Sequence, residues 1–147
     1  MQILYIHLFL TEVMNACILY YSLSGNTRRF AEAISDSLQI PVFNLITSEY
    51  SIVEEFDILI LGTPVHGFSP ARHVLSYVEK LPEGNGKKAV IFCTYAIRKG
   101  NALKKLEKKL AKKDYNVILR VSKRGFKLNK QDFSDAIHEI AKILEDS

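Results

Sequence analysis

Five short runs of apolar residues, rich in β-branched side chains, predict the strands of this protein. The runs are continuous rather than alternating, which is typical of strands whose sheet is covered on both faces. The predicted strands are Ala16–Tyr21, Val42–Ile46, Asp57–Gly62, Lys88–Cys93 and Asn116–Val121.

Between the strands, apolar residues recur every three or four positions, which is the spacing of one buried helix face. Four such faces are predicted: Phe30, Ile34 and Leu38; Val74, Leu75, Val78 and Leu81; Leu103, Leu106 and Leu110; Phe133, Ile137, Ile140 and Leu144. The connection at residues 49–55 is short and only weakly helical. Strands that alternate with helices indicate parallel pairing, because a parallel connection needs a crossover of about a dozen residues. The pattern therefore predicts a doubly wound α/β fold around a five-stranded parallel sheet.

The composition is that of one ordinary globular domain. The chain has 147 residues, of which 48% are hydrophobic and 24% charged, and this length suffices to bury a mixed core. Cys17 and Cys93 lie inside apolar runs without a paired spacing. The sequence therefore predicts neither a disulfide framework nor a cysteine metal site, and we expect a cytoplasmic protein.

Residues 1–13 precede the first predicted strand and need a separate interpretation. Residues 1–10 are mostly apolar, but they are too few to span a bilayer and lack the basic flank and cleavage site of a secretory signal. We expect the fold to occupy residues 14–147. Residues 1–13 are then either an extension, such as an added edge strand or a swapping arm, or the product of a misassigned start upstream of Met14.

A cluster of small and polar residues lies between the first predicted strand and the first predicted helix. In parallel sheets, ligands bind beyond the carboxyl ends of the strands. A helix N-terminus there offers unpaired N–H groups and partial positive charge to a phosphate, and hydroxyl side chains add donors. A simple helix cap is the alternative, but a cap needs only one such residue. The cluster consists of Ser22, Leu23, Ser24, Gly25, Asn26 and Thr27.

This cluster resembles the FMN-phosphate loop of the flavodoxin family, in which a hydroxyl residue and a variable residue precede Ser/Thr-Gly-Asn-Thr. The Gly-Lys-Ser/Thr of a P-loop and the Gly-x-Gly-x-x-Gly fingerprint of dinucleotide sites are both missing from this segment. The resemblance extends over residues 14–146. It implies a flavodoxin-like sheet with strand order 2-1-3-4-5, and FMN as cofactor with its phosphate at residues 22–27.

The segment after the third predicted strand resembles the flavodoxin loop that wraps one side of the flavin ring. Pro64 stiffens the turn, and His66 or Phe68 offers a flat face for stacking. By resemblance, a peptide group near Gly67 turns over to bond the reduced ring. An ordinary surface histidine is the alternative interpretation of His66. The expected cofactor contacts are Thr63, Pro64, Val65, His66, Gly67 and Phe68.

The segment after the fourth predicted strand stands where flavodoxins have their second ring-flanking loop, and it implies stacking by Tyr95. The Thr-Tyr pair and a later Gly-Asn-Ala-Leu resemble the flavodoxin-like half of proteins that fuse this domain to a ferredoxin. The clustered cysteines of the iron–sulfur half are missing from this sequence. Cys93 either touches the ring or is a buried, unreactive thiol. The expected contacts are Thr94, Tyr95, Ala96 and Gly100.

The net charge of +4 distinguishes this chain from most flavodoxins, which are acidic. Arg28, Arg29, Arg98 and Lys99 lie close to the expected site, so we expect a less negative flavin potential and a partner surface different from that of the acidic flavodoxins. The lysine pairs of residues 104–113 recur at helical spacing and are interpreted as a solvated face, which could also steer an acidic redox protein as partner. Neither a nucleic acid nor a membrane is expected as partner.

An electron carrier that exchanges electrons with a redox protein is the function that these features favour. Two alternatives stay open. The chain could be an FMN-dependent reductase of a quinone, porphyrinogen or other small molecule, or a flavodoxin-fold module that has lost its cofactor.

Overall fold

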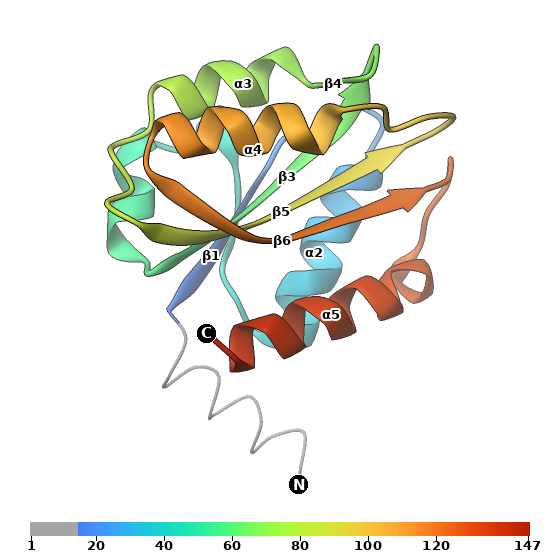
Figure 1. Cartoon of the computed structure of the whole chain (residues 1–147). Coiled ribbons are helices and arrows are strands. Elements are labelled where there is room, and N and C mark those ends of the chain that lie inside the picture. The colour runs from blue at the N-terminus through green and yellow to red at the C-terminus, as the bar shows by residue number, and fades with distance from the viewer. Residues whose placement is uncertain (1–14) are drawn as a thin grey trace, which may run out of the picture.

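The computed structural model describes residues 15–147, so the predicted extension at residues 1–13 lies outside the described part. Five strands are hydrogen-bonded in the order β2-β1-β3-β5-β6, and all of these pairs are parallel (Figure 1). A short strand, β4, pairs antiparallel with β3. The predicted order 2-1-3-4-5 of the five parallel strands is confirmed. The strands are β1 (Ala16–Tyr20), β2 (Val42–Asn44), β3 (Ile58–His66), β4 (Ser69–Pro70), β5 (Lys87–Tyr95) and β6 (Tyr115–Arg124).

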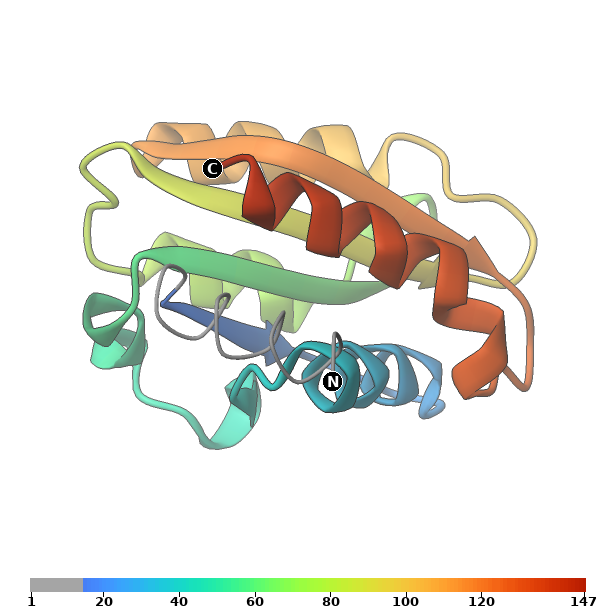
Figure 2. The ribbon, with the colours of Figure 1, turned by 90° about the horizontal axis from the view of Figure 1, so that it is seen from below.

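Helices cover both faces of the sheet (Figures 1 and 2). One face carries α3 (Arg72–Glu79) and α4 (Ala102–Lys112), and the other carries α2 (Asn26–Leu38) and α5 (Ser134–Glu145). Short 3-10 helices occupy Leu45–Thr47, Tyr50–Glu55 and Lys130–Phe133. None of the helices within residues 15–147 is long and apolar enough to cross a membrane.

The strands are continuously apolar because successive side chains enter two different cores. In β1, Ile18 belongs to the cluster beneath α2 and α5, whereas Leu19 belongs to the cluster beneath α3 and α4. Ile60 and Leu61 divide in the same way in β3. Side chains of a strand alternate between faces, so both sets must be apolar when both faces are buried.

The third strand is longer than the sequence predicts. The expected loop after Gly62 is largely strand, since β3 continues to His66. Thr63 and Pro64 stay aligned with Cys93 and Thr94 of β5, and the end of β3 pairs with β4 in a hairpin. The extension carries this segment past the end of β1, toward the loop that precedes α2.

Gly62 allows a close approach inside this sheet. A Cβ atom at this position would lie 2.1 Å from Cζ of Phe92 on the adjacent strand β5. The Phe92 ring is fully buried and packs against Phe30 of α2, with ring centroids 4.7 Å apart. The aromatic core beneath α2 therefore depends on the missing side chain of Gly62.

We expect Gly62→Ala to lower the free energy of unfolding by about 1–3 kcal/mol, because the added methyl group overpacks the core against Phe92. Urea denaturation measures this loss. The double variant Gly62→Ala/Phe92→Leu is the control. Because leucine is smaller than phenylalanine, it leaves room for the added methyl group. The double variant should therefore lose less free energy of unfolding than the two single variants lose in sum. Full stability of Gly62→Ala alone would contradict the packing described here.

Candidate functional site

Segments that follow four strands meet around one cleft at the carboxyl edge of the sheet. Its volume is about 270 Å³. The lining comes from the β1–α2 segment, the end of β3, the end of β5 with the residue after it, and the segment after β6. The lining residues are Leu23, Ser24, Asn26, Pro64, Val65, His66, Thr94, Tyr95, Ala96, Gly125 and Phe126. The structure thus brings together residues from all three segments that the sequence predicts to contact a cofactor.

The first turn of α2 presents open N–H groups beside this cleft. Gly25 precedes the helix in the left-handed conformation, with φ +100, and no side chain caps the helix. The Gly25 N–H donates to Ser22 Oγ at 3.1 Å. The first helical bond runs from the Arg29 N–H to the Gly25 carbonyl at 3.0 Å. The N–H groups of residues 26–28 therefore precede the helical bonding and, with the positive end of the helix dipole, suit an anion.

Asn26 holds the segment after β6 against α2. Its side-chain nitrogen donates to the carbonyl groups of Gly125 and Phe126. Its Oδ1 accepts from the Leu128 N–H at 3.0 Å and from Arg29 at 2.6 Å. Arg29 Nε also donates to the Leu128 carbonyl at 2.7 Å. The Asn26 side chain thus positions one wall of the cleft, while its backbone N–H remains at the helix terminus.

Two buried hydroxyl groups connect the β1–α2 segment to the end of β5. Thr27 Oγ1 lies 2.7 Å from Thr94 Oγ1, and both residues are buried. Thr94 lines the cleft, whereas Thr27 lies behind the lining. This hydrogen bond fixes the start of α2 relative to the strand that carries Tyr95. The assignment of both residues as FMN contacts stays a prediction.

Val65 and His66 of the β3–β4 hairpin line the cleft, whereas Gly67 and Phe68 at its turn are not among the lining residues. The hydroxyl of Thr63 is buried at the base of the hairpin and accepts from the Ala71 N–H at 3.0 Å. Gly67 and Phe68 form the turn with φ +55 and +66, which is the left-handed pair that a two-residue hairpin needs. Gly100 packs against this turn, since a Cβ there would lie 2.7 Å from the Cβ of Phe68. The second and third predicted segments therefore touch each other.

The walls of the cleft combine apolar and aromatic surface with few polar side chains. Leu23 and Phe126, from the segments after β1 and β6, both line the cleft and are 70% and 73% exposed. Tyr95 is half-buried, and His66 and Ser24 are exposed. Such a site can hold a flat apolar ring against its walls and a phosphate at the helix N-terminus.

Cys93 does not reach the cleft lining, although it directly precedes Thr94. The side chain is fully buried in the core beneath α3 and α4. Burial raises the pKa of the Cys93 thiol to about 12, so the unreactive neutral form persists at physiological pH. Of the two interpretations of this cysteine, the structure supports the buried, unreactive thiol.

The sequence-based prediction omits Gly125 and Phe126 from the site. Both follow β6 directly, at the same edge as the segments after β1, β3 and β5. Their position in the sequence is a signal for the site, because ligands bind beyond the carboxyl ends of the strands of such a sheet and these residues follow the last predicted strand. An exposed phenylalanine beside a glycine at that place is the feature that would have found them.

Comparisons with known proteins agree with the fold described above. A family model described as a flavodoxin domain matches residues 17–133. An uncharacterised protein of Methanocaldococcus jannaschii is 28% identical over 116 residues, which are 77% of this chain and 77% of that protein. In fold, the chain is similar to a flavodoxin from the domain Archaea, with 21% identity, a TM-score of 0.71 and coverage of 90% of this chain and 99% of the other. A flavodoxin from Streptococcus pneumoniae gives 20% identity and a TM-score of 0.74, with coverage of 88% and 97%.

We expect Thr27→Val to lower the free energy of unfolding by about 1–3 kcal/mol, because the Thr94 hydroxyl would be left buried without its partner. The double variant Thr27→Val/Thr94→Val removes both hydroxyl groups and should recover most of that stability. Urea denaturation of the two single variants and the double variant measures the coupling. Losses that simply add would contradict a direct bond between these hydroxyl groups.

Proposed function

Since this chain belongs to the flavodoxin family, we propose that it binds FMN in the cleft at the carboxyl edge and acts as an electron carrier. The observation that carries this proposal is the cleft itself, which lies beside the open N-terminus of α2 and is lined by segments from four strand ends. Bound FMN would supply the redox chemistry, since its ring accepts and releases electrons.

The residues at the start of α2 suit the phosphate of FMN. The backbone N–H groups of residues 26–28 are the donors that precede the helical bonding, and the exposed hydroxyl of Ser24 can add one more. The helix dipole favours a negative charge at this place. Asn26 and Thr27 support the site through their side chains by fixing the neighbouring segments.

The remaining cleft walls suit the flavin ring. Leu23, Tyr95 and Phe126 offer apolar and aromatic surface from three different segments. Pro64 and Val65 belong to β3, whose pairing with both β4 and β5 keeps that wall rigid. Rigid walls lower the entropic cost of ordering a ring between them.

The carrier role is supported by the proteins that share this fold over their whole length. The two flavodoxins compared above are matched over 97–99% of their own chains.

We expect Ser24→Asp to weaken FMN binding at least tenfold, about 1.4 kcal/mol, because a carboxylate would repel the phosphate at the N-terminus of α2. Riboflavin, which has the same ring but no phosphate, should bind equally well to Ser24→Asp and to the unaltered protein. Fluorescence titration of both flavins measures these affinities. Ser24→Asn is the matched control, because it has the same shape without the charge. If Ser24→Asp weakened the binding of FMN and of riboflavin equally, the phosphate would not bind at this loop.

The carrier role also predicts how the protein takes up electrons. We expect the FMN-loaded protein to oxidise neither NADH nor NADPH with a quinone as acceptor faster than free FMN does. Electron uptake should require a reductase or another redox protein. Steady-state absorbance assays with both nucleotides test this, and saturable turnover with quinone would assign the chain to the reductases instead.

A further inference from the structure

The segments that surround the cleft carry positive charge only. No Asp or Glu occurs in residues 21–29, 64–72, 94–101 or 122–130, although the chain contains 16 of them. The exposed cations in these segments are Arg28, Arg72, Arg98, Lys99, Arg124, Lys127 and Lys130. Within residues 15–147, only Arg28 among them forms an ion pair, with Glu32 at 3.5 Å. The edge of the molecule around the cleft is therefore cationic and largely uncompensated.

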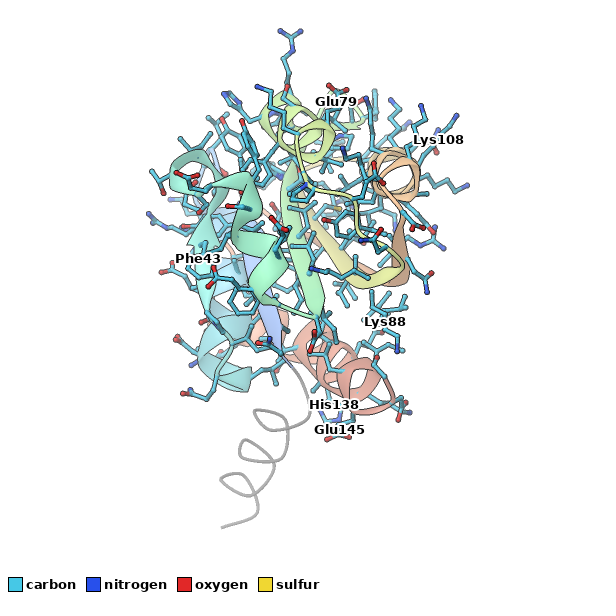
Figure 3. The ribbon with its side chains drawn as sticks, turned by 90° about the vertical axis from the view of Figure 1, so that its left-hand side faces the viewer. Phe43, Glu79, Lys88, Lys108, His138 and Glu145 are labelled. Carbon is cyan, nitrogen blue, oxygen red and sulfur yellow. The ribbon has the colours of Figure 1, made fainter. Side chains whose placement is uncertain are left out.

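The carboxylates of the described residues lie outside these four segments, and one of them, Asp132, accepts a hydrogen bond from the Asn129 N–H at 2.9 Å. Figure 3 looks onto the opposite edge of the sheet, where Glu79 ends α3 and Glu145 ends α5. Two lysines have carboxylate partners there: Lys109 of α4 pairs with Glu79, and Lys113, directly after α4, lies 3.9 Å from Glu83. The net charge of +4 therefore understates the potential at the carboxyl edge.

Exposed apolar side chains stand among these cations. Six large apolar side chains are exposed in the described part of the chain, and four of them lie at this edge. Leu23 and Phe126 line the cleft, while Phe68 (55% exposed) and Ile97 (71% exposed) occupy the β3–β4 turn and the segment before α4. Isolated apolar side chains on a surface need no explanation, but four that share one edge mark an interaction site.

We propose that this edge is the docking surface for an acidic redox protein, with Leu23, Phe68, Ile97 and Phe126 at its centre and the seven exposed cations around them. The proposal rests on the proposed FMN site, because a partner seated here would lie over the cleft that holds the flavin. Protein interfaces combine apolar anchors with a charged rim in this way.

Two other polyanions are less well matched to the surface. Single-stranded nucleic acid is held by successive aromatic stacking faces along a basic groove, whereas here two of the four apolar residues are the aliphatic Leu23 and Ile97. An anionic membrane is usually met by an amphipathic helix with basic residues on its polar face, whereas these apolar residues all lie outside the helices. Both polyanions are outcomes of the test.

The electrostatic part of this docking has a defined signature. Charge complementarity raises association rates about 10- to 1000-fold at low ionic strength. Added salt removes the gain, because the Debye length falls to about 8 Å at 0.15 M. The apolar anchors give contact area that does not depend on salt.

The test uses the full chain loaded with FMN and an acidic plant-type ferredoxin as the probe. Arg98→Glu/Lys127→Glu reverses two cations in two different segments, and neither side chain makes a hydrogen bond or ion pair within residues 15–147. Lys108→Glu/Lys112→Glu is the matched control, because it changes the net charge by the same amount at two exposed positions of α4; Figure 3 shows Lys108 at the surface of the molecule. The visible flavin spectrum of each variant reports FMN content before binding is measured by calorimetry.

We expect the ferredoxin Kd to rise at least about tenfold for Arg98→Glu/Lys127→Glu and less than about threefold for Lys108→Glu/Lys112→Glu. If both variants weakened ferredoxin binding equally, net charge alone would explain the change in affinity, and the proposal would be overturned. No binding of ferredoxin at low salt would also overturn it. The proposal would also be overturned if a DNA oligonucleotide or phosphatidylserine vesicles bound more tightly than ferredoxin, and if that binding were weakened by Arg98→Glu/Lys127→Glu but not by Lys108→Glu/Lys112→Glu. A protein without flavin bands would refute the FMN site separately, since ferredoxin binding is measured independently of it.

Discussion

Parallel pairing of β1, β3, β5 and β6 brings the carboxyl ends of four strands to one edge, and everything proposed for this protein depends on that arrangement. Because successive strands run in the same direction, each segment that leaves the sheet at this edge lies beside the next. The sheet keeps this geometry because both of its faces are buried, one beneath α2 and α5 and the other beneath α3 and α4. Gly62 shows how closely the packing is fitted, since its missing side chain makes room for the Phe92 ring.

The edge is then closed by a few side-chain bonds that join segments far apart in the sequence. Asn26 reaches across to residues 125–128, and the hydroxyl of Thr27 meets that of Thr94. Both residues belong to the cluster at residues 22–27 that resembles a phosphate-binding motif, and both lie in the first turn of α2. Their side chains hold the walls of the cleft in place, and this structural role stands beside the phosphate-binding role that we propose for the backbone N–H groups of the same turn.

Much of this architecture could be predicted from the sequence. Continuous apolar runs such as residues 16–20 predict strands buried on both faces, and helical spacing at Phe30, Ile34 and Leu38 predicts α2. The length of β3 could not be predicted in the same way. Thr63 and Pro64 are typical of a turn, and only their alignment with β5 keeps them in the strand. The partners of Asn26 are equally invisible in the sequence, because they lie about a hundred positions away and involve backbone atoms that any residue supplies.

The central claim is that the cleft at the carboxyl edge, beside the first turn of α2, is the flavin site. Amide chemical-shift mapping by NMR on isotope-labelled protein during FMN addition tests it directly. The account predicts that the largest shifts fall on residues 23–28, with further shifts near Tyr95 and Phe126. Shifts confined to the separate cleft lined by Leu45, Tyr50 and Lys80, or no shifts at all, would contradict it.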